Sequence, residues 1–366
     1  MRILVVGAGI LGASVAYHLS LEKGVDVEVV DEEHQGKATL AGAGIVCPWA
    51  TKVEEPAFYR FYAAGGAYYR KLVANLAENG ETDFGYRQVG ALVLAENETE
   101  LAQVEKRVLT RVASVPEAGK VSRLSGKDAQ ALFPPLRDDF LALHIEGGAR
   151  VEARAIAAAM MRVAVKNGAK ARKGHVELAL ANGKPAATLN GEKLEADLVV
   201  VAAGAWANDI LSSLGVSIAV APQKGQIIHL RVPQETQDWP VLLPQASHYM
   251  LAFDDNRVVV GATRETGSGF DYRVTAGGQA EVLNFGLDLA PGLANATLIE
   301  TRVGFRPATE GVKPLLGRIP GMEGMLIGNG LGAGGLTMGP LAGRLLAQTA
   351  LGEPTDLDLA DYPVLV

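Results

Sequence analysis

The chain almost lacks cysteine, since Cys47 is the only thiol among its 366 residues. A single cysteine cannot form an internal disulfide, which fits a reducing compartment. The six histidines, at positions 18, 34, 144, 175, 229 and 248, show no metal-ligand spacing. We therefore predict neither a disulfide nor a bound metal ion.

Positive charge and long apolar runs are also scarce. The net charge is -7 and no run of Lys and Arg stands out, which argues against a nucleic-acid partner. The longest apolar run, residues 198–207, is far shorter than a membrane span. Gly7, Gly9 and Gly12 interrupt the first apolar stretch, unlike a signal peptide. We predict a cytoplasmic protein without a transmembrane segment; peripheral membrane association and a homo-oligomer stay open.

What the chain does have is glycine, 43 residues in all, and an apolar fraction of 48%. The length suits two domains, and the apolar content suits a sizeable core. Continuous apolar runs at 2–6, 198–203 and 325–328 predict buried parallel strands. Alternating runs at 218–232, 248–253 and 257–263 predict antiparallel strands. The fold class is therefore α/β with two domains, one carrying a parallel sheet and one a mainly antiparallel sheet.

Helical patterns and turn residues fill the rest of the chain. We predict further strands at 86–94, 140–145 and 298–305, and a hairpin at Asn190-Gly191. Residues 37–50 are small and glycine-rich, without helical or strand periodicity. Helices are predicted at 10–21, 56–77, 99–113, 126–132, 152–166, 275–289 and 336–351, with another near Trp206.

The opening segment carries a phosphate-binding pattern. Residues 7–12 read G-x-G-x-x-G between a predicted strand and a predicted helix. Gly7 permits the tight turn, Gly9 lets the backbone approach a pyrophosphate, and Gly12 lets the helix pack against the strand. The helix N-terminus then directs free N–H groups and partial positive charge at the phosphates. A dinucleotide is predicted here.

An acidic residue completes the pattern. Asp31 ends the second strand, 19 residues after Gly12, and can accept both hydroxyls of an adenosine ribose. It would also repel a 2′-phosphate, which disfavours NADP. Three later features favour FAD over NAD: the small-residue loop 36–44, the strand and glycine turn at 198–206, and the glycine-rich loop 328–335. The helix after that last loop could stabilise the negative charge of a reduced flavin.

These motifs together resemble the D-amino acid oxidase and glycine oxidase family of flavoenzymes, essentially from end to end. The resemblance rests on the N-terminal motif, Ala202-Ala203-Gly204-Ala205-Trp206, the segment Val303 to Thr309 with Gly-Phe-Arg-Pro, Pro314 with Gly317, and the final glycine-rich loop. The final loop resembles that of bacterial D-amino acid dehydrogenases more closely than that of glycine oxidase. The family resemblance implies an FAD-binding domain of residues 1–82, 145–215 and 318–366. Residues 83–144 and 216–317 would form the substrate domain.

The resemblance assigns roles to single residues. Arg306 matches the arginine that grips a substrate carboxylate, and its two parallel N–H donors suit that task. Tyr249 matches a substrate-contacting tyrosine, with an ordinary strand aromatic as the alternative. The motifs and the resemblance assign these residues to the cofactor: Gly7, Gly9, Ile10, Leu11, Gly12, Asp31, Glu32, Thr39, Ala41, Gly42, Gly44, Ile45, Val46, Val176, Ala203, Gly204, Trp206, Gly304, Arg306, Gly330, Leu331, Gly332, Gly334, Gly335, Leu336 and Thr337.

Some positions depart from the family pattern. Ala333-Gly334 stand where glycine oxidase has a second arginine, and Arg264 stands where it has an apolar residue. Arg264 could meet a polar or acidic substrate group, although we favour solvent. No cysteine lies between residues 300 and 340, where the sarcosine oxidase branch attaches its flavin, so we expect noncovalent FAD. Cys47 is expected to be buried rather than reactive.

The implied activity is FAD-dependent oxidative deamination of a D-amino acid or a glycine-like amine. Hydride would pass from Cα to flavin N5, and the imino acid would hydrolyse to an oxo acid and ammonia. A dehydrogenase for N-methyl or imino amino acids, sarcosine-like or D-proline-like and with a quinone acceptor, is an alternative. A nicotinamide dehydrogenase and a non-catalytic flavoprotein subunit of a larger dehydrogenase are rivals of other kinds. The sequence leaves the side-chain preference open, and also the choice of oxygen or a quinone.

Overall fold

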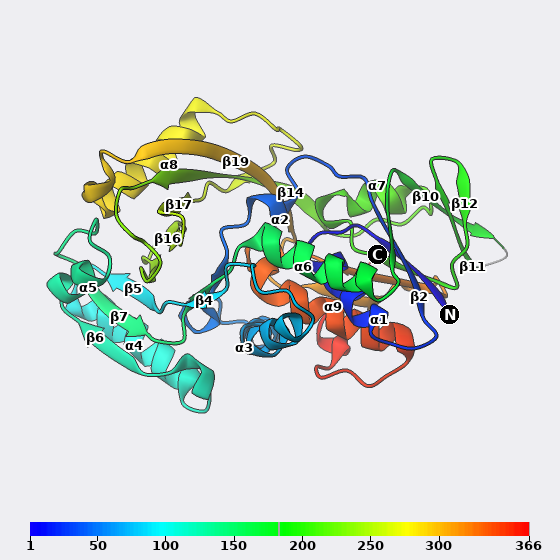
Figure 1. Cartoon of the computed structure of the whole chain (residues 1–366), viewed down its shortest axis with the longest axis horizontal. Coiled ribbons are helices and arrows are strands. Elements are labelled where there is room, and N and C mark those ends of the chain that lie inside the picture. The colour runs from blue at the N-terminus through cyan, green and yellow to red at the C-terminus, as the bar shows by residue number, and fades with distance from the viewer. Residues whose placement is uncertain (182–183, 366) are drawn as a thin grey trace.

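The computed structural model describes residues 1–181 and 184–365. Residues 182–183 and 366, which the sequence assigns to the FAD-binding domain, lie outside the described residues. Two large sheets divide the molecule, and Figure 1 shows them at opposite ends of its long axis. The α/β fold predicted from the sequence is confirmed. The exact boundaries of the two domains stay a prediction.

The first sheet is mostly parallel and holds the strands predicted at the start, middle and end of the chain. Its order is β20-β21-β13-β1-β2-β9, and only β20 runs antiparallel to its neighbour. The strands are β1 (Arg2–Val6), β2 (Asp26–Asp31), β9 (Lys170–Lys173), β13 (Leu198–Val201), β20 (Leu315–Arg318) and β21 (Met325–Asn329). Continuous apolar sequence suits these central strands because both faces are covered.

Helices cover one face of this sheet, and a small second sheet with α7 covers the other. The helices are α1 (Ile10–Ser20), α3 (Pro56–Glu78), α6 (Ala153–Lys166) and α9 (Gly335–Leu351). The other face packs against β10 (Val176–Ala181), β11 (Lys184–Leu189), β12 (Glu192–Leu194) and α7 (Ala207–Ser212). Asn190 and Gly191 both have positive φ and join β11 to β12, so the predicted hairpin is confirmed.

The second large sheet is mainly antiparallel, with β15 and β5 as its parallel pair. Its order is β18-β14-β17-β16-β15-β5-β7-β6, and β19 pairs with the other edge of β14. Its strands are β5 (Ala91–Ala95), β6 (Val121–Leu124), β7 (Leu141–Ile145), β14 (Ala221–Arg231), β15 (Val241–Leu243), β16 (Tyr249–Phe253), β17 (Arg257–Gly261), β18 (Glu265–Thr266) and β19 (Thr297–Ala308). Helices α4 (Glu98–Val112), α5 (Gly126–Leu132) and α8 (Ala276–Leu289) pack on it.

Long β14 and β19 extend from the antiparallel sheet toward the parallel sheet (Figure 1). At its far end β19 reaches the first sheet's loops, where the Phe305 amide donates to the Gly36 carbonyl at 2.8 Å. A small sheet also lies between the two, formed by β3 (Ile45–Val46), β8 (Ala149–Arg150) and β4 (Arg87–Gln88). The fold therefore brings residues near 40, 225 and 306 together.

Several sequence predictions need correction. The strand predicted at 86–94 is two strands, because Gly90 has a φ of +80° and breaks the run between β4 and β5. Residues 37–50, which showed no periodicity, contain α2 (Ala38–Ala41), β3 and a short 3₁₀ turn. Strands β6, β9, β15, β18 and β20 were not predicted, since they are short and several are polar.

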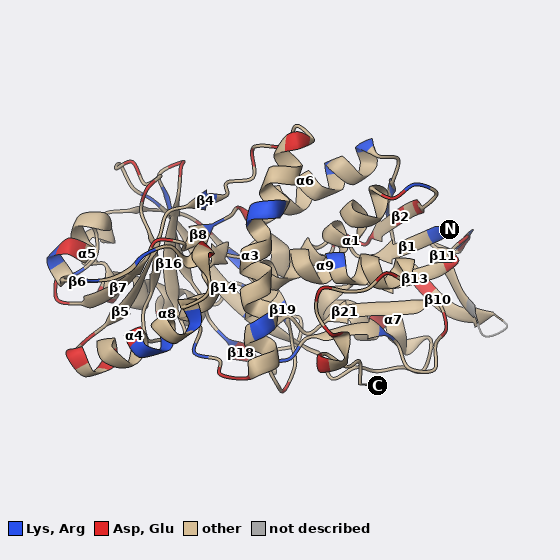
Figure 2. Ribbon diagram, turned by 90° about the horizontal axis from the view of Figure 1, so that it is seen from below, with Lys and Arg blue, Asp and Glu red and all other residues tan. Residues whose placement is uncertain are grey.

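Charged residues of both signs are spread along the chain. Figure 2 shows Lys and Arg interspersed with Asp and Glu along the ribbon. Among the described residues, no helix combines the length and the apolarity that crossing a bilayer requires. The main cavity of the described residues lies inside the molecule, where the two sheets meet.

Candidate active site

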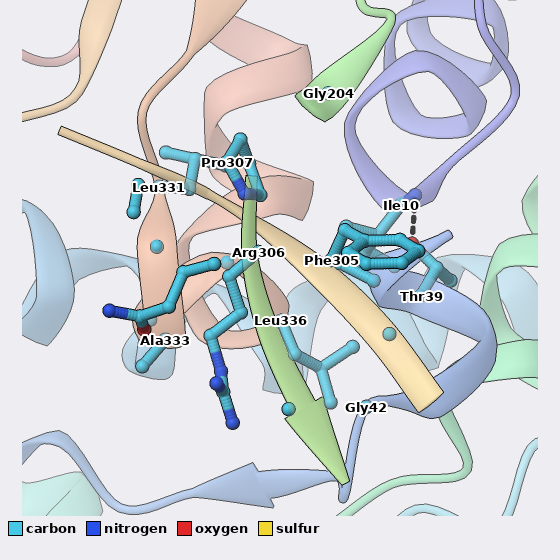
Figure 3. Close-up of a pocket in the computed structure, with 18 of the residues that line it drawn as sticks. Ile10, Thr39, Gly42, Gly204, Phe305, Arg306, Pro307, Leu331, Ala333 and Leu336 are labelled. Atoms are coloured by element: carbon cyan, nitrogen blue, oxygen red, sulfur yellow. Dashed lines mark hydrogen bonds between the residues drawn. The ribbon is translucent and has the colours of Figure 1, made fainter. Parts of the chain in front are cut away.

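A cavity of about 610 Å³ runs between the two large sheets. Its wall includes the glycine loop after β1, the loop before α9, and the facing ends of β14, β16 and β19. Figure 3 shows Phe305 and Arg306 extending from β19, and Ile10 hydrogen bonded to Thr39. This volume lies within the range of sites for small molecules and cofactors.

The glycines of the first loop have the geometry that a phosphate site needs. Gly7 has a φ of +104°, and a Cβ there would lie 2.5 Å from the Ala202 carbonyl oxygen. A Cβ at Gly12 would overlap the Gly7 carbonyl, because α1 packs directly against the loop. At Gly9 a Cβ would meet only the Thr39 hydroxyl, at 3.4 Å, so the space beside the loop is open. The backbone here can approach a ligand closely.

Asp31 lies at the end of β2, beside this loop. One of its carboxylate oxygens accepts the Ala8 amide at 2.5 Å, and the other accepts the Glu33 amide at 2.6 Å and the Lys37 ammonium at 2.9 Å. Burial works to raise the pKa of Asp31, but Lys37 and the two amides outweigh it and hold that pKa below its ordinary value. The carboxylate is therefore ionised and fixed in position at neutral pH.

Aromatic side chains stack next to the acidic end of the cavity. The Trp206 ring lies between His34, at a centroid distance of 4.5 Å, and Phe270, at 4.9 Å. Both pairs are nearly parallel, with interplanar angles of 5° and 11°. His34 also lies 3.2 Å from a carboxylate oxygen of Glu32. Trp206, His34 and Glu32 line the cavity, and Phe270 covers Trp206 from the second sheet's side.

The glycine-rich loop before α9 forms another wall. Gly330 and Gly332 have φ values of +71° and +51°, which favour glycine. A Cβ at Gly332 or at Gly204 would meet no atom within 4 Å, so this wall leaves room for a ligand. The Asn329 amide donates to the Gly204 carbonyl at 2.9 Å and ties the loop to β13's end. The start of α9 lies at this wall, since Gly335 and Leu336 both line the cavity.

The positively charged side chain of Arg306 lines the far end of the cavity. Arg306 donates to the Thr263 carbonyl at 3.1 Å, and Tyr249 lies near enough to influence the pKa of Arg306; all three residues lie on the second sheet or beside it. Within residues 1–181 and 184–365 no carboxylate forms an ion pair with Arg306. Burial lowers the pKa of Arg306, although an arginine remains charged at neutral pH. A half-buried guanidinium that lines a cavity without a carboxylate partner is suited to an anionic ligand.

Tyr249 and Cys47 are protonated neighbours of this end. Burial raises the pKa of Tyr249, while Arg306 and Arg264 work in the opposite direction. Cys47 lines the cavity, and burial raises its pKa to about 12. The thiolate is the reactive form of cysteine, so the structure supports the expected buried and unreactive thiol.

Most of the predicted site residues do line the cavity. Those that do are Gly7, Gly9, Ile10, Leu11, Asp31, Glu32, Thr39, Ala41, Gly42, Gly44, Ile45, Val176, Ala203, Gly204, Trp206, Tyr249, Gly304, Arg306, Gly330, Leu331, Gly332, Gly334, Gly335 and Leu336. The exceptions are Gly12, Val46 and Thr337, and Thr337 instead donates to the Ile45 carbonyl at 3.1 Å. Gly12, Val46 and Thr337 would affect the cofactor only indirectly, by holding the residues that line the cavity in place. The individual roles stay predictions.

The structure adds residues that the sequence did not single out. Lys37 contacts Asp31, and Lys52 lines the other end of the cavity while donating to the Gln245 carbonyl at 2.7 Å. Gln223 and Gly225 face the cavity from β14. A Cβ at Gly225 would lie 2.7 Å from the Arg306 guanidinium, so this glycine leaves space for the arginine. Only the pairing of β14 with β19, which is not local in sequence, could have revealed it.

This combination of a dinucleotide loop, a second glycine-rich loop and a separate substrate sheet defines a flavin-dependent oxidoreductase. The model of the FAD dependent oxidoreductase (DAO) family matches residues 2–349. The chain therefore belongs to that family, and its cofactor is FAD rather than a nicotinamide dinucleotide. The free space beside Gly204 and Gly332 and the ionised, hydrogen-bonded Asp31 are consistent with this cofactor.

Individual proteins of known sequence or structure are similar to this chain over nearly its whole length. The sequence is 45% identical over 362 residues to the uncharacterized oxidoreductase YurR of Bacillus subtilis (strain 168), covering 98% of this chain and 97% of the relative. The structure of iminodiacetate oxidase (IdaA) from Chelativorans sp. BNC1 is 56% identical, with a TM-score of 0.97 and 99% of each chain covered. Glycine oxidase from Geobacillus kaustophilus is 26% identical, with a TM-score of 0.87, covering 100% of this chain and 98% of its own.

Proposed function

We propose that this enzyme oxidises a carboxylated secondary amine of the iminodiacetate type at the carbon between the nitrogen and one carboxylate. The observation that carries this proposal is the half-buried Arg306, which lines the same cavity as the cofactor loops and has no carboxylate partner among the described residues. The iminodiacetate oxidase likeness supports a secondary amine. The family supports only the broader class, an FAD-dependent oxidoreductase.

The residues of the chain would mainly position the substrate. Arg306 would hold one carboxylate with two parallel hydrogen bonds, and Tyr249 would fix the guanidinium and the adjacent carboxylate. When bound, FAD supplies the acceptor for the hydride that leaves the substrate carbon. The amine must be neutral for this step, and the cations around the site favour loss of its proton. Water then hydrolyses the released imine to an oxo acid and an amine.

FAD would be bound by the walls described above. The glycine loop and the N-terminus of α1 would meet the pyrophosphate, Asp31 would accept the ribose hydroxyls, and the start of α9 would face the flavin ring. Cys47, the only thiol, is protonated, which supports noncovalent binding. For the electron acceptor we propose oxygen, because the relative at 56% identity is described as an oxidase. A quinone is the alternative.

Oxidative deamination of glycine or a D-amino acid is a second candidate, because glycine oxidases match the whole fold. An anaerobic reduction assay distinguishes the two. Iminodiacetate, N-methylglycine, glycine, D-alanine and L-alanine are added separately to the yellow holoenzyme. We expect iminodiacetate to bleach the flavin fastest, and readmitted oxygen to give hydrogen peroxide. Faster bleaching by glycine or D-alanine would favour deamination, and no bleaching by any of them would contradict both.

A further inference from the structure

A second arginine, Arg264, shares the cavity with Arg306. Both line its wall together with Tyr249. Arg264 is near enough to lower the pKa of Arg306, after the larger effect of burial. In the described part of the chain, Arg264 forms no ion pair with a carboxylate. Two such cations repel each other, so the cavity favours a ligand that brings two negative groups.

The residues on either side of Arg264 are held in a buried polar cluster. We call this the Lys224 cluster; it consists of Lys224, Gln226, Thr263, Glu265 and Asp271. The Thr263 hydroxyl accepts the backbone N–H of Gln226 at 2.9 Å and donates to a carboxylate oxygen of Glu265 at 2.6 Å. The Lys224 ammonium lies 3.1 Å from Asp271 and 3.4 Å from Glu265. Lys224, Gln226 and Thr263 are fully buried, with 0% exposure.

This cluster determines which way Arg264 faces. Glu265 pairs with Lys224 in the β14–β18 ladder, so the segment runs as an extended chain at that point. Alternate side chains of an extended chain point to opposite sides. Because Thr263 and Glu265 both point into the cluster, Arg264 must point to the other side, where the cavity lies. Arg264 is exposed, in agreement with the solvent contact favoured from the sequence, and the same side chain also lines the cavity.

We propose that Arg264 binds a second carboxylate of the substrate, and that the Lys224 cluster holds Arg264 in position for it. The enzyme would then prefer amino acids whose nitrogen substituent ends in a carboxylate over those with an uncharged substituent. This inference rests on the proposed function, in which Arg306 holds the first carboxylate. Arg264 is a specificity residue in this scheme, and Lys224 is a positioning residue.

Two unreactive acids test the subsite without turnover. Glutarate has the shape of iminodiacetate with a methylene in place of the nitrogen, and butyrate has the shape of N-methylglycine. Each is titrated into the holoenzyme, and binding is followed by the perturbed flavin spectrum. We expect glutarate to bind at least about tenfold more tightly than butyrate, since one charge-assisted hydrogen-bonded contact is added.

The variant Arg264→Met should reduce this glutarate-to-butyrate ratio about tenfold, toward unity. Arg231→Met is the matched control, because Arg231 is an exposed arginine of β14 that does not line the cavity. Its ratio should equal that of the wild type. An unchanged ratio in Arg264→Met would overturn the proposal, and so would equal loss of the ratio in both variants.

Lys224 needs a separate test, because a buried lysine also contributes to stability. Lys224→Met should lower the ratio about threefold or more, as Arg264 loses its fixed orientation, and Lys224→Arg should restore part of it. If Lys224→Met does not fold, Glu265→Gln keeps the uncharged hydrogen bonds of the cluster and should also lower the ratio. A folded variant with lower thermal stability but a wild-type ratio would overturn the positioning role.

The outcomes separate this inference from the proposed function. If the ratio depends on Arg264 but iminodiacetate fails to reduce the flavin, the second-carboxylate site is supported and the proposed oxidation is wrong. If iminodiacetate reduces the flavin but Arg264→Met keeps the wild-type ratio, the oxidation is supported and the subsite is wrong.

Discussion

The two ends of the cavity are built in different ways. Glycine backbone forms much of the cofactor end, with Gly7 and Gly9 in one short segment and Gly332 in another, while Gly12 lets α1 pack behind the first segment. The substrate end consists mainly of side chains that come from separate strands of the antiparallel sheet. A backbone site requires particular glycines at fixed spacing, whereas a side-chain site requires only that the fold bring the right groups together.

The two ends also differ in charge. At the cofactor end Asp31 is paired with Lys37 at 2.9 Å, so its charge is compensated. At the substrate end Arg306 and Arg264 share one cavity without a carboxylate partner in the described ranges. The first end is therefore complete without a substrate, while the second gains a counter-ion only when an acid binds. Variants at each end should fail in different ways.

The largest effect is expected from Gly12→Ala, at the cofactor end. The new Cβ would overlap the Gly7 carbonyl and push α1 away from the loop. We expect destabilisation of about 3 kcal/mol or more, the upper part of the range for overpacking, together with loss of bound FAD. The flavin-to-protein absorbance ratio and the melting temperature measure these effects.

Gly277→Ala is the matched control for that change. Gly277 lies in the first turn of α8, and a Cβ there would meet no atom within 4 Å. Alanine is the better helix former by about 1 kcal/mol, so stability should stay equal or rise. If Gly12→Ala purified with wild-type flavin content and stability, the backbone account of the cofactor end would be wrong.

Arg306→Ala should give the next largest effect, confined to the substrate end. Loss of one partner of a desolvated charge pair costs about 2–5 kcal/mol, so kcat/KM with a carboxylate substrate should fall at least about thirty-fold. The flavin content should remain that of the wild type. Arg302→Ala, on the same strand but paired with Glu300, is the control and should keep its efficiency. Normal turnover by Arg306→Ala would show that Arg306 does not bind the substrate carboxylate.

The same contrast explains how much could be predicted from the sequence. Gly7, Gly9, Gly12 and Asp31 lie in one strand–loop–helix–strand unit, so their spacing alone located the cofactor end. Arg306 and Tyr249 came from the family resemblance, because no local spacing connects β16 with β19. The structure brings both to one cavity, and their contact with each other supports the prediction.

Other features depend on pairings that are distant in sequence. Gly225 leaves room for Arg306 only because β14 and β19 are neighbours, and Gln223 faces Arg306 in the same ladder. The Lys224 cluster joins residues from 224 to 271, and burial of Lys224 contradicts the usual exposure of lysine. The short polar strand β9 at the sheet edge was missed for a related reason, since its pattern KARK carries no apolar periodicity.

Asp31→Asn sharpens the comparison by removing charge from the cofactor end alone. We expect FAD affinity to fall about tenfold, because a charged acceptor is lost, while the glutarate-to-butyrate ratio of the FAD-saturated enzyme is kept. In the FAD-free protein the lowered pKa of Asp31 means that its ionised form stabilises the fold at neutral pH. That stability is lost as pH falls below about 4, so the difference from wild type in urea unfolding should shrink in acid. A difference that grows in acid would contradict this sign.

Tyr249→Phe should have the smallest effect. It tests whether Tyr249 helps Arg306 to position the substrate carboxylate. The change removes the hydroxyl that contacts Arg306 but keeps the ring. Loss of one ordinary hydrogen bond should raise KM about threefold to tenfold, with a smaller change in kcat and no change in flavin content.

Burial keeps the pKa of Tyr249 above its ordinary value, so the wild-type hydroxyl is protonated at neutral pH and cannot act as a base there. The pH profile of kcat/KM between pH 6 and about 9 should therefore keep its shape in the variant, since the ordinary pKa of tyrosine is about 10. A neutral-pH limb that disappears with the hydroxyl would make Tyr249 a proton-transfer group rather than a support for Arg306.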